Sequence, residues 1–311
     1  MSKKLTTRKC GWQSLIICLA TLLLPLSSLA DEGFGQRILG AVGLDAGSQS
    51  DPGVYVGDRF IQFSADRYIG ADGKQVPIKG LDVSSFANVF AIAGTYKFET
   101  GPYYTAAFAA PVAGVSVHSE WPPKSFENSG LGDLFIQPIK LGWRLPQLDL
   151  TTSYSLYAPT NQLNRKGLAH SQWMHQISAG GTVFFDEAKT FRLSALSSYN
   201  IYDRKPNIDV TRGDTVQIQG GLGSRLFKVL DIGLAGYAFW QVAADTGKQL
   251  PPALHGVSEY AMGLGPEIGL LIPQIRGKLT ARYEWELQSR SRLDGQVLVV
   301  SLSLLGWQPE D

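Results

Sequence analysis

The sequence is short of several features that define common protein classes. Only 18% of its 311 residues are charged and the net charge is +1, far from the basic balance of a nucleic-acid-binding protein, so we expect no nucleic-acid partner. After residue 30, no apolar run reaches the roughly 18 residues that a membrane-spanning helix needs. The 44% hydrophobic content argues against an intrinsically disordered chain. What remains is a glycine-rich and aromatic-rich chain whose apolar residues are dispersed.

Cysteine is almost absent, and both cysteines, Cys10 and Cys18, lie in a segment that we expect to be removed. Residues 1–30 combine a basic start, an apolar stretch over Ser14–Leu24 and small residues before the end, the pattern of a secretory signal peptide cleaved near Ala30. Cleavage there removes four cationic and no acidic residues, which changes the net charge from +1 to −3. The exported chain then has no disulfide, no thiolate metal site and no cysteine nucleophile.

What the sequence has instead is a strict alternation of apolar and polar residues. From Gly53 onward, apolar side chains recur at every second position, which is the period of a β-strand with two different faces. We predict twelve strands, at 54–66, 85–98, 103–117, 131–143, 148–158, 173–185, 190–202, 214–227, 229–242, 259–272, 275–288 and 295–305. Such strands are longer than the usual five or so residues of soluble sheets, and they suit a tilted crossing of a bilayer.

The predicted connections alternate between short turns and long polar loops. The short ones are 99–102, 144–147, 186–189, 228 and 273–274, and the long ones are 67–84, 118–130, 159–172, 203–213 and 243–258. Short turns at one end and long loops at the other are typical of outer-membrane barrels. We therefore predict an all-β fold, a transmembrane antiparallel β-barrel of about 12 strands with short periplasmic turns and long extracellular loops. A soluble exported β-sandwich or barrel is the alternative.

The chain divides into three parts on this interpretation. Residues 1–30 are the signal peptide, residues 31–52 form an N-terminal leader or a lumen plug, and residues 53–311 form the outer-membrane β-barrel. A barrel of twelve strands encloses more space than one of eight and less than a 16-stranded porin. We therefore expect a narrow, selective pore.

Charged residues on the polar faces are the candidate site. Arg282, Glu284 and Glu286 share the polar face of one predicted strand, so neighbouring strands must supply their partners. Alternation and local motifs give the full set of candidates for the lumen or its constriction: Asp133, Arg225, Gln241, Asp245, Glu267, Arg282, Glu284, Glu286 and Arg290, with Asp231 a further candidate by alternation. Two roles stay open: an ion-pair network that supports the barrel, or a constriction that selects solutes.

No pattern points to catalysis or to a metal. The four histidines fall at loops or strand ends without metal-ligand spacing, and the sequence holds no GxSxG motif. We therefore predict no enzyme activity, no catalytic residue, no metal and no cofactor. Two alternatives remain: an outer-membrane lipid-modifying enzyme that uses His175 and Ser197, and a structural or surface-binding barrel whose long loops contact a partner.

Several short motifs resemble those of one family. They are Gly130-Leu131-Gly132-Asp133-Leu134, Pro138, Gly142-Trp143 and Ala158-Pro159-Thr160, followed by Gly236-Tyr237, Gln241, Asp245, Gly265-Pro266, Arg290, Arg292 and Gly295. They are similar to motifs of the putative MetA-pathway of phenol degradation family, also known as SphA-like proteins, over about Gly53 to Leu305.

The resemblance implies an outer-membrane β-barrel of a Gram-negative bacterium, associated with the catabolism of aromatic compounds. It supplies no catalytic residue, and the phenol label reflects genetic context. Together with the strand pattern it predicts a channel or transporter for passive uptake of small hydrophobic or aromatic solutes. The expected partners are outer-membrane lipid, such a solute, and the barrel-assembly machinery.

Overall fold

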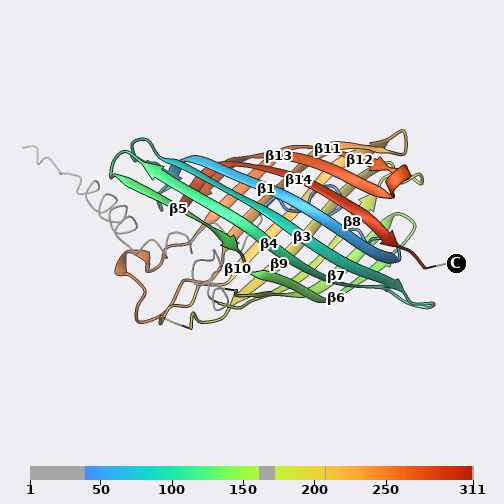
Figure 1. Cartoon of the computed structure of the whole chain (residues 1–311), viewed down its shortest axis with the longest axis horizontal. Helices are drawn as coiled ribbons and strands as arrows, with labels where there is room; N and C mark the ends of the chain where they lie inside the picture. The colour runs from blue at the N-terminus through green and yellow to red at the C-terminus, as the bar shows by residue number, and fades with distance from the viewer. Residues whose placement is uncertain (1–38, 161–171, 207, 310–311) are drawn as a thin grey trace, which may run out of the picture.

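Most of the described residues belong to one closed β-sheet (Figure 1). A computed structural model of the protein describes residues 39–160, 172–206 and 208–309. Within these residues, twelve antiparallel strands follow one another around the sheet, and β14 pairs with β1 to close it. The predicted fold class, an all-β barrel of twelve strands, is confirmed.

The barrel strands lie within a few residues of their predicted ranges. They are β1 (Gly53–Ile69), β3 (Asp82–Lys97), β4 (Tyr103–Ser119), β6 (Leu134–Arg144), β7 (Leu148–Ala158), β8 (Met174–Phe184), β9 (Phe191–Tyr202), β10 (Thr215–Leu226), β11 (Leu230–Gln241), β12 (Tyr260–Ile272), β13 (Gly277–Arg290) and β14 (Arg292–Trp307). Two short strands extend the sheet, β2 (Gln75–Val76) beside β1 and β5 (Lys124–Leu131) beside β4. Two 3-10 helices complete the elements, η1 (Pro252–Leu254) and η2 (Pro273–Ile275).

One predicted loop is in fact mostly strand. The range 118–130 was expected to be a long loop, but β5 occupies most of it and pairs with β4 from Val112 to Ser119. Gly132 and Asp133 separate β5 from β6, so the two strands follow one another along the same edge of β4. Backbone hydrogen bonds to β4, and not the burial of an apolar face, hold this polar segment in the sheet. Its sequence therefore lacks the alternation of apolar and polar residues that predicts a strand.

The two faces of the sheet are chemically opposite. On β9, Arg192 is 2% exposed and faces the interior, whereas its neighbour Leu193 is 47% exposed on the outside. The same inversion recurs on most strands, where large apolar side chains stand on the outer surface and polar ones are buried inside, although Ile61, Val297 and Val299 form an apolar cluster on the inner face of β1 and β14. The exposed tryptophans include Trp143, Trp173, Trp240, Trp285 and Trp307. An apolar exterior with aromatic residues and a polar interior is the arrangement of a membrane barrel, and it is opposite to that of a soluble one.

The two ends of the barrel differ. At one end, which we call the turn end, short connections join β3 to β4, β6 to β7, β8 to β9, β10 to β11 and β12 to β13. β1 begins and β14 finishes at this end, close to the C-terminus (Figure 1). The longer connections lie at the other end, which we call the loop end, although Ser291 alone separates β13 from β14 there.

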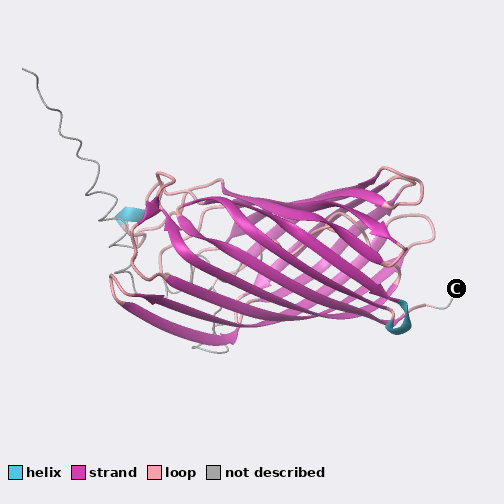
Figure 2. Cartoon of the chain, turned by 90° about the horizontal axis from the view of Figure 1, so that it is seen from above, coloured by secondary structure: helices cyan, strands magenta, loops and turns pink. Residues whose placement is uncertain are grey.

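The strands run obliquely to the long axis of the barrel, as closure of a sheet requires (Figure 2). Within residues 39–160, 172–206 and 208–309, no helix is both long and apolar enough to cross a membrane.

The orientation of the faces gives a first prediction, which compares two residues of β10. Leu222 is 42% exposed on the outside, and Gln217 is 7% exposed inside. Leu222→Arg puts a charge against lipid and is expected to lower the free energy of unfolding by about 2–4 kcal/mol. Gln217→Arg puts the same charge into the polar lumen and is expected to cost clearly less. Denaturant unfolding in lipid vesicles measures both, and equal losses would contradict this assignment of the faces.

Candidate functional site

The lumen of the barrel contains part of the chain. Residues 39–52, which precede β1 and which we call the lumen segment, are hydrogen-bonded to side chains that point inward from the wall. The backbone N–H of Leu44 donates to Glu267 Oε2 at 3.1 Å, and that of Gly47 donates to Ser194 Oγ at 2.8 Å. Residues 31–38 lie outside the described part of the chain, so the predicted division into leader and barrel at residue 52 stays a prediction.

The lumen segment runs from the loop-end part of β11 to the turn end of the barrel. Leu39 packs against Tyr237 and Phe239, which lie toward the loop end of β11. At the other end of the segment, Arg144, the last residue of β6, donates to Asp51 Oδ1 at 2.6 Å. The chain then turns into β1, so the lumen segment crosses the turn-end mouth of the barrel.

Leu44 anchors the segment in a seat made of glycines. Its side chain is fully buried against Gly221, Gly223 and Gly233 of β10 and β11. A Cβ added at any of these glycines would come within 2.7–2.9 Å of a Leu44 methyl carbon, closer than side-chain carbons pack. These glycines therefore leave room in the lumen, as strand glycines do where another segment approaches closely.

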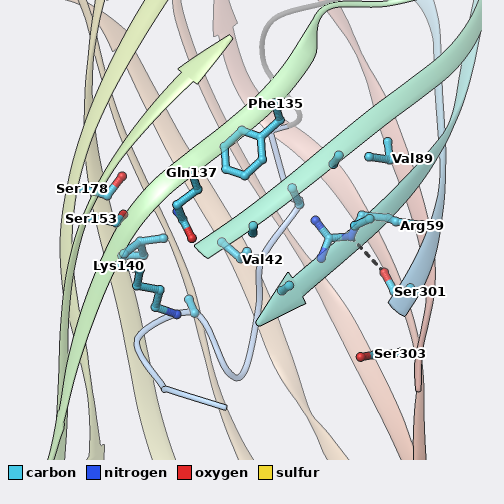
Figure 3. Close-up of a pocket in the computed structure, with 18 of the residues that line it drawn as sticks. Val42, Arg59, Val89, Phe135, Gln137, Lys140, Ser153, Ser178, Ser301 and Ser303 are labelled. Atoms are coloured by element: carbon cyan, nitrogen blue, oxygen red, sulfur yellow. Dashed lines mark hydrogen bonds between the residues drawn. The ribbon is translucent and has the colours of Figure 1, made fainter. Parts of the chain in front are cut away.

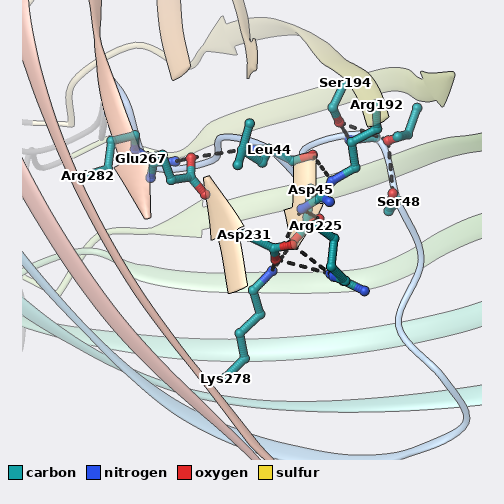
Figure 4. Close-up of polar contacts among 12 residues, drawn as sticks. Leu44, Asp45, Ser48, Arg192, Ser194, Arg225, Asp231, Glu267, Lys278 and Arg282 are labelled. Carbon is teal, nitrogen blue, oxygen red and sulfur yellow. Dashed lines mark hydrogen bonds and ion pairs between the residues drawn. The ribbon is translucent and has the colours of Figure 1, made fainter. Parts of the chain in front are cut away.

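An ion-pair network fixes the next residue of the segment to the wall (Figure 4). The Asp45 carboxylate contacts Arg192 Nη2 at 3.1 Å and the Lys278 ammonium. The Asp231 carboxylate contacts the same two cations, at 3.1 and 2.7 Å, and also Arg225 Nε at 2.8 Å. Two acids thus share three cations, and one of the two acids is supplied by the lumen segment.

Electrostatic attraction outweighs desolvation at Asp45. Burial alone would raise the pKa of its carboxyl, but the neighbouring Lys278 ammonium and Arg192 guanidinium hold the pKa below the ordinary value of 3.8. Asp45 is therefore ionised at neutral pH, and its attraction to the wall is present throughout the physiological range.

A second charged group lies beside the segment on β12 and β13. Arg282 Nη1 donates to Glu267 Oε2 at 2.9 Å, and Arg282 Nε lies 3.7 Å from Glu284 Oε2. Glu284 is fully buried, and a Cβ at Gly40 would lie only 1.8 Å from its carboxylate oxygen. The lumen segment therefore packs its backbone directly against this carboxylate, with a glycine in the left-handed region at φ +72°.

A third group lies nearer the loop end. Glu286 accepts hydrogen bonds from the Tyr237 hydroxyl at 3.1 Å and the Gly295 N–H at 2.8 Å, and Arg292 Nη2 lies 3.4 Å from it. Three of the nine candidates from the sequence, Arg282, Glu284 and Glu286, thus lie on one inward face, where their alternation placed them.

The structure brings five of the nine candidate residues into the lumen groups just described: Arg225, Glu267, Arg282, Glu284 and Glu286. The other four lie apart from them. Gln241 donates to Asp245 at 2.6 Å toward the loop end, and the exposed Arg290 donates to the backbone of Ala71 at the same end. Asp133 is buried at the break between β5 and β6. That any of the nine selects solutes stays a prediction.

Sequence reasoning missed several lumen residues. Arg192 and Lys278 were on predicted polar faces, so alternation could have placed them with Arg225 and with Asp231, which pairs with both. Asp45 lies outside any strand, and no period indicates which way its side chain points. Arg59 and Lys140 are inward-facing cations on β1 and β6 that the candidate list omitted.

A cavity of about 440 Å³ remains between the lumen segment and the opposite wall (Figure 3). Val42 and Asp45 of the segment form one side, and inward residues of β1, β3, β4 and β6 to β10 form the rest, together with β14. A cavity of this size falls in the range that small-molecule sites occupy, about 300–1,000 Å³.

Nothing in the described residues forms a metal site or a serine–histidine pair. No group of three potential metal ligands occurs within these residues. His175 pairs with Tyr154 and with Asp203, and the sheet register places His175 four positions along β8 from Ala179, the partner of Ser197. At about 3.3 Å per residue, the two proposed catalytic side chains are far beyond hydrogen-bond reach.

Comparisons with known proteins agree with this geometry. The model of the family described as "Putative MetA-pathway of phenol degradation" matches residues 65–302. The COG4313 outer membrane channel from Pseudomonas putida F1 has a similar structure, with a TM-score of 0.73 and 13% identity over 85% of this chain and 99% of that one. The β domain of the Bordetella autotransporter BrkA superposes with a TM-score of 0.50 and 11% identity over 82% and 100%. No curated protein sequence matches the chain.

The Leu44 seat gives a second prediction. Leu44→Ala removes most of the buried side chain, which is expected to cost the attachment of the lumen segment about 2–5 kcal/mol. The segment should then leave the turn-end mouth more often, and single-channel conductance in planar bilayers should rise. Ser50→Ala, an exposed position of the same segment, is the matched control. Identical conductance of the two variants would show that Leu44 does not hold the segment.

Asp45 gives a third prediction, on pH. A carboxyl whose pKa is lowered in the attached state contributes stability above pH 3.8 and loses it as the pH falls through the lowered pKa. The Asp45 contacts should therefore produce no change in wild-type conductance between about pH 5 and 8 and should release the segment only in stronger acid. Asp45→Asn should show raised conductance already at neutral pH, and Asp72→Asn in an exposed loop should not. A wild-type transition between about pH 5 and 8 that Asp45→Asn abolishes would contradict this account.

Proposed function

The chain belongs to the "Putative MetA-pathway of phenol degradation" family, and from that premise we propose that it is an outer-membrane channel for passive uptake of small hydrophobic or aromatic solutes. The observation that carries the proposal is a closed barrel, apolar outside and polar inside, whose lumen keeps a cavity of about 440 Å³ beside the segment that enters it. Such a barrel satisfies every backbone hydrogen bond across a bilayer and leaves a path through its interior.

The outer face supports a location in the outer membrane of a Gram-negative bacterium. Exposed apolar side chains as large as Phe90, Leu234 and Ile268 are 51–55% exposed, and outer-membrane lipid is the partner that would cover them. Export through a signal peptide cleaved near Ala30 and insertion by the barrel-assembly machinery belong to the same proposal. The turn end is then periplasmic and the loop end extracellular.

The interior supports passage of small solutes only. The lumen segment crosses the turn-end mouth, and the ion-pair groups of β9 to β13 occupy the wall next to it. The cavity lies on the other side of the segment and is lined mainly by hydroxyl, amide and small apolar side chains, together with a few charged ones such as Arg59 and Lys140. A volume of about 440 Å³ suits a compact solute. The protein would act as a channel and not as a catalyst, and the separation of His175 from Ser197 gives the enzyme alternative no support.

The fourth prediction tests this function in two steps. Purified protein run on a denaturing gel without boiling should migrate faster than boiled protein, because a closed barrel resists unfolding in detergent. Liposomes that contain the folded protein should then admit toluene or phenol faster than empty liposomes and should exclude a trisaccharide. A heat-dependent shift without any solute flux above background would overturn the channel proposal and leave the barrel in place.

A further inference from the structure

Two cations face the cavity without a carboxylate partner. Arg59 reaches it from β1 and Lys140 from β6 (Figure 3). Arg59 Nε donates to Ser301 Oγ at 3.1 Å, and Lys140 Nζ donates to the carbonyl oxygen of Ser48 at 3.0 Å. Both partners are neutral. A guanidinium has five N–H groups and an ammonium three, so each cation keeps donors that no residue within the described ranges accepts.

Other cations inside the barrel have carboxylate partners. Arg192, Arg225 and Lys278 share Asp45 and Asp231. Arg282 pairs with Glu267, and Arg292 pairs with Glu286. Glu267 acts on Arg59 through space, but its carboxylate is already engaged by Arg282 and by the Leu44 N–H. Two half-buried cations that face the cavity without a carboxylate partner leave positive charge there for an anionic ligand to pair with.

The walls of the cavity have two chemical characters. The side formed by β3 and β4 is small and apolar, with Ala91, Ala93, Ala107 and Ala109, and Phe135 of β6 lies next to it. The side formed by β7, β8 and β10 carries hydroxyl and amide groups, among them Ser153, Ser178 and Gln217. A flat apolar body fits against the alanines, and a polar head group fits toward the other wall.

We propose that the cavity binds small aromatic carboxylates, with the carboxylate against the Arg59 guanidinium and the ring against the alanine wall, while the Lys140 ammonium on the other side of the cavity adds to its positive charge. The planar fork of a guanidinium matches the two oxygens of a carboxylate, and a second cation facing the same cavity strengthens its attraction for an anion. The inference deepens the proposed channel function, on which it rests for transport, and it names the solute class as anionic. Binding itself can be measured without transport.

The experiment titrates the full-length protein in detergent micelles by calorimetry. The probes are benzoate, benzyl alcohol as a neutral aromatic of similar size, and acetate as a carboxylate without a ring. Benzoate should bind tighter than either. In Arg59→Gln/Lys140→Gln, benzoate affinity should fall by about ten-fold or more, the loss expected for charge-assisted hydrogen bonds, while benzyl alcohol affinity stays the same. Lys74→Gln, in an exposed loop, removes a charge outside the barrel and should change nothing.

Equal affinity for benzoate and benzyl alcohol, or unchanged benzoate affinity in the double variant, would overturn the proposal. If the double variant shows no heat-dependent gel shift, it has not folded, and a measurement on the wild-type protein tests the proposal instead. In a KCl gradient across a planar bilayer its reversal potential should favour chloride and benzoate should reduce the current, whereas preference for potassium would overturn the proposal. Benzoate binding without solute flux would support the binding site and refute the channel. Solute flux without any preference for benzoate would support the channel and refute the binding site.

Discussion

Closure of the sheet is the constraint on which the rest of the structure depends. Lipid offers no hydrogen bonds, so every backbone N–H and C=O of a spanning strand must pair with a neighbour, and the edges at β1 and β14 must meet. Closure gives each strand one face toward lipid and one toward the lumen. The alternation of the sequence follows from this division, and so does the reversal of the usual rule that apolar residues are buried.

A polar lumen creates a second problem, because charges enclosed there need partners. The wall supplies some of them, but Asp45 comes from the lumen segment and completes the group around Arg192 and Lys278. Glycines on β10 and β11 make the space that Leu44 occupies. The segment and the wall are therefore complementary in both charge and shape. Arg59 faces the cavity from the wall and Lys140 receives only the backbone carbonyl of Ser48 from the segment, so neither cation gains a carboxylate partner.

The sequence predicted what is periodic and missed what is not. The twelve strands and the inward placement of Glu284 and Glu286 follow from alternation, which each strand carries within itself. The β5 strand was missed because its sequence shows no apolar face. Which carboxylates contact Arg192, and why none contacts Arg59, depends on the register between strands and on the path of residues 39–52. Neither is encoded in a local pattern.

The most direct test of the central claim, that small aromatic solutes cross through this lumen, uses the lack of cysteine in the barrel. Ser153→Cys introduces a single thiol that faces the cavity. After modification with a bulky water-soluble thiol reagent, the variant in liposomes should lose the flux of a small aromatic solute, while the wild type under the same treatment should keep it. Undiminished flux through fully modified protein would contradict the account.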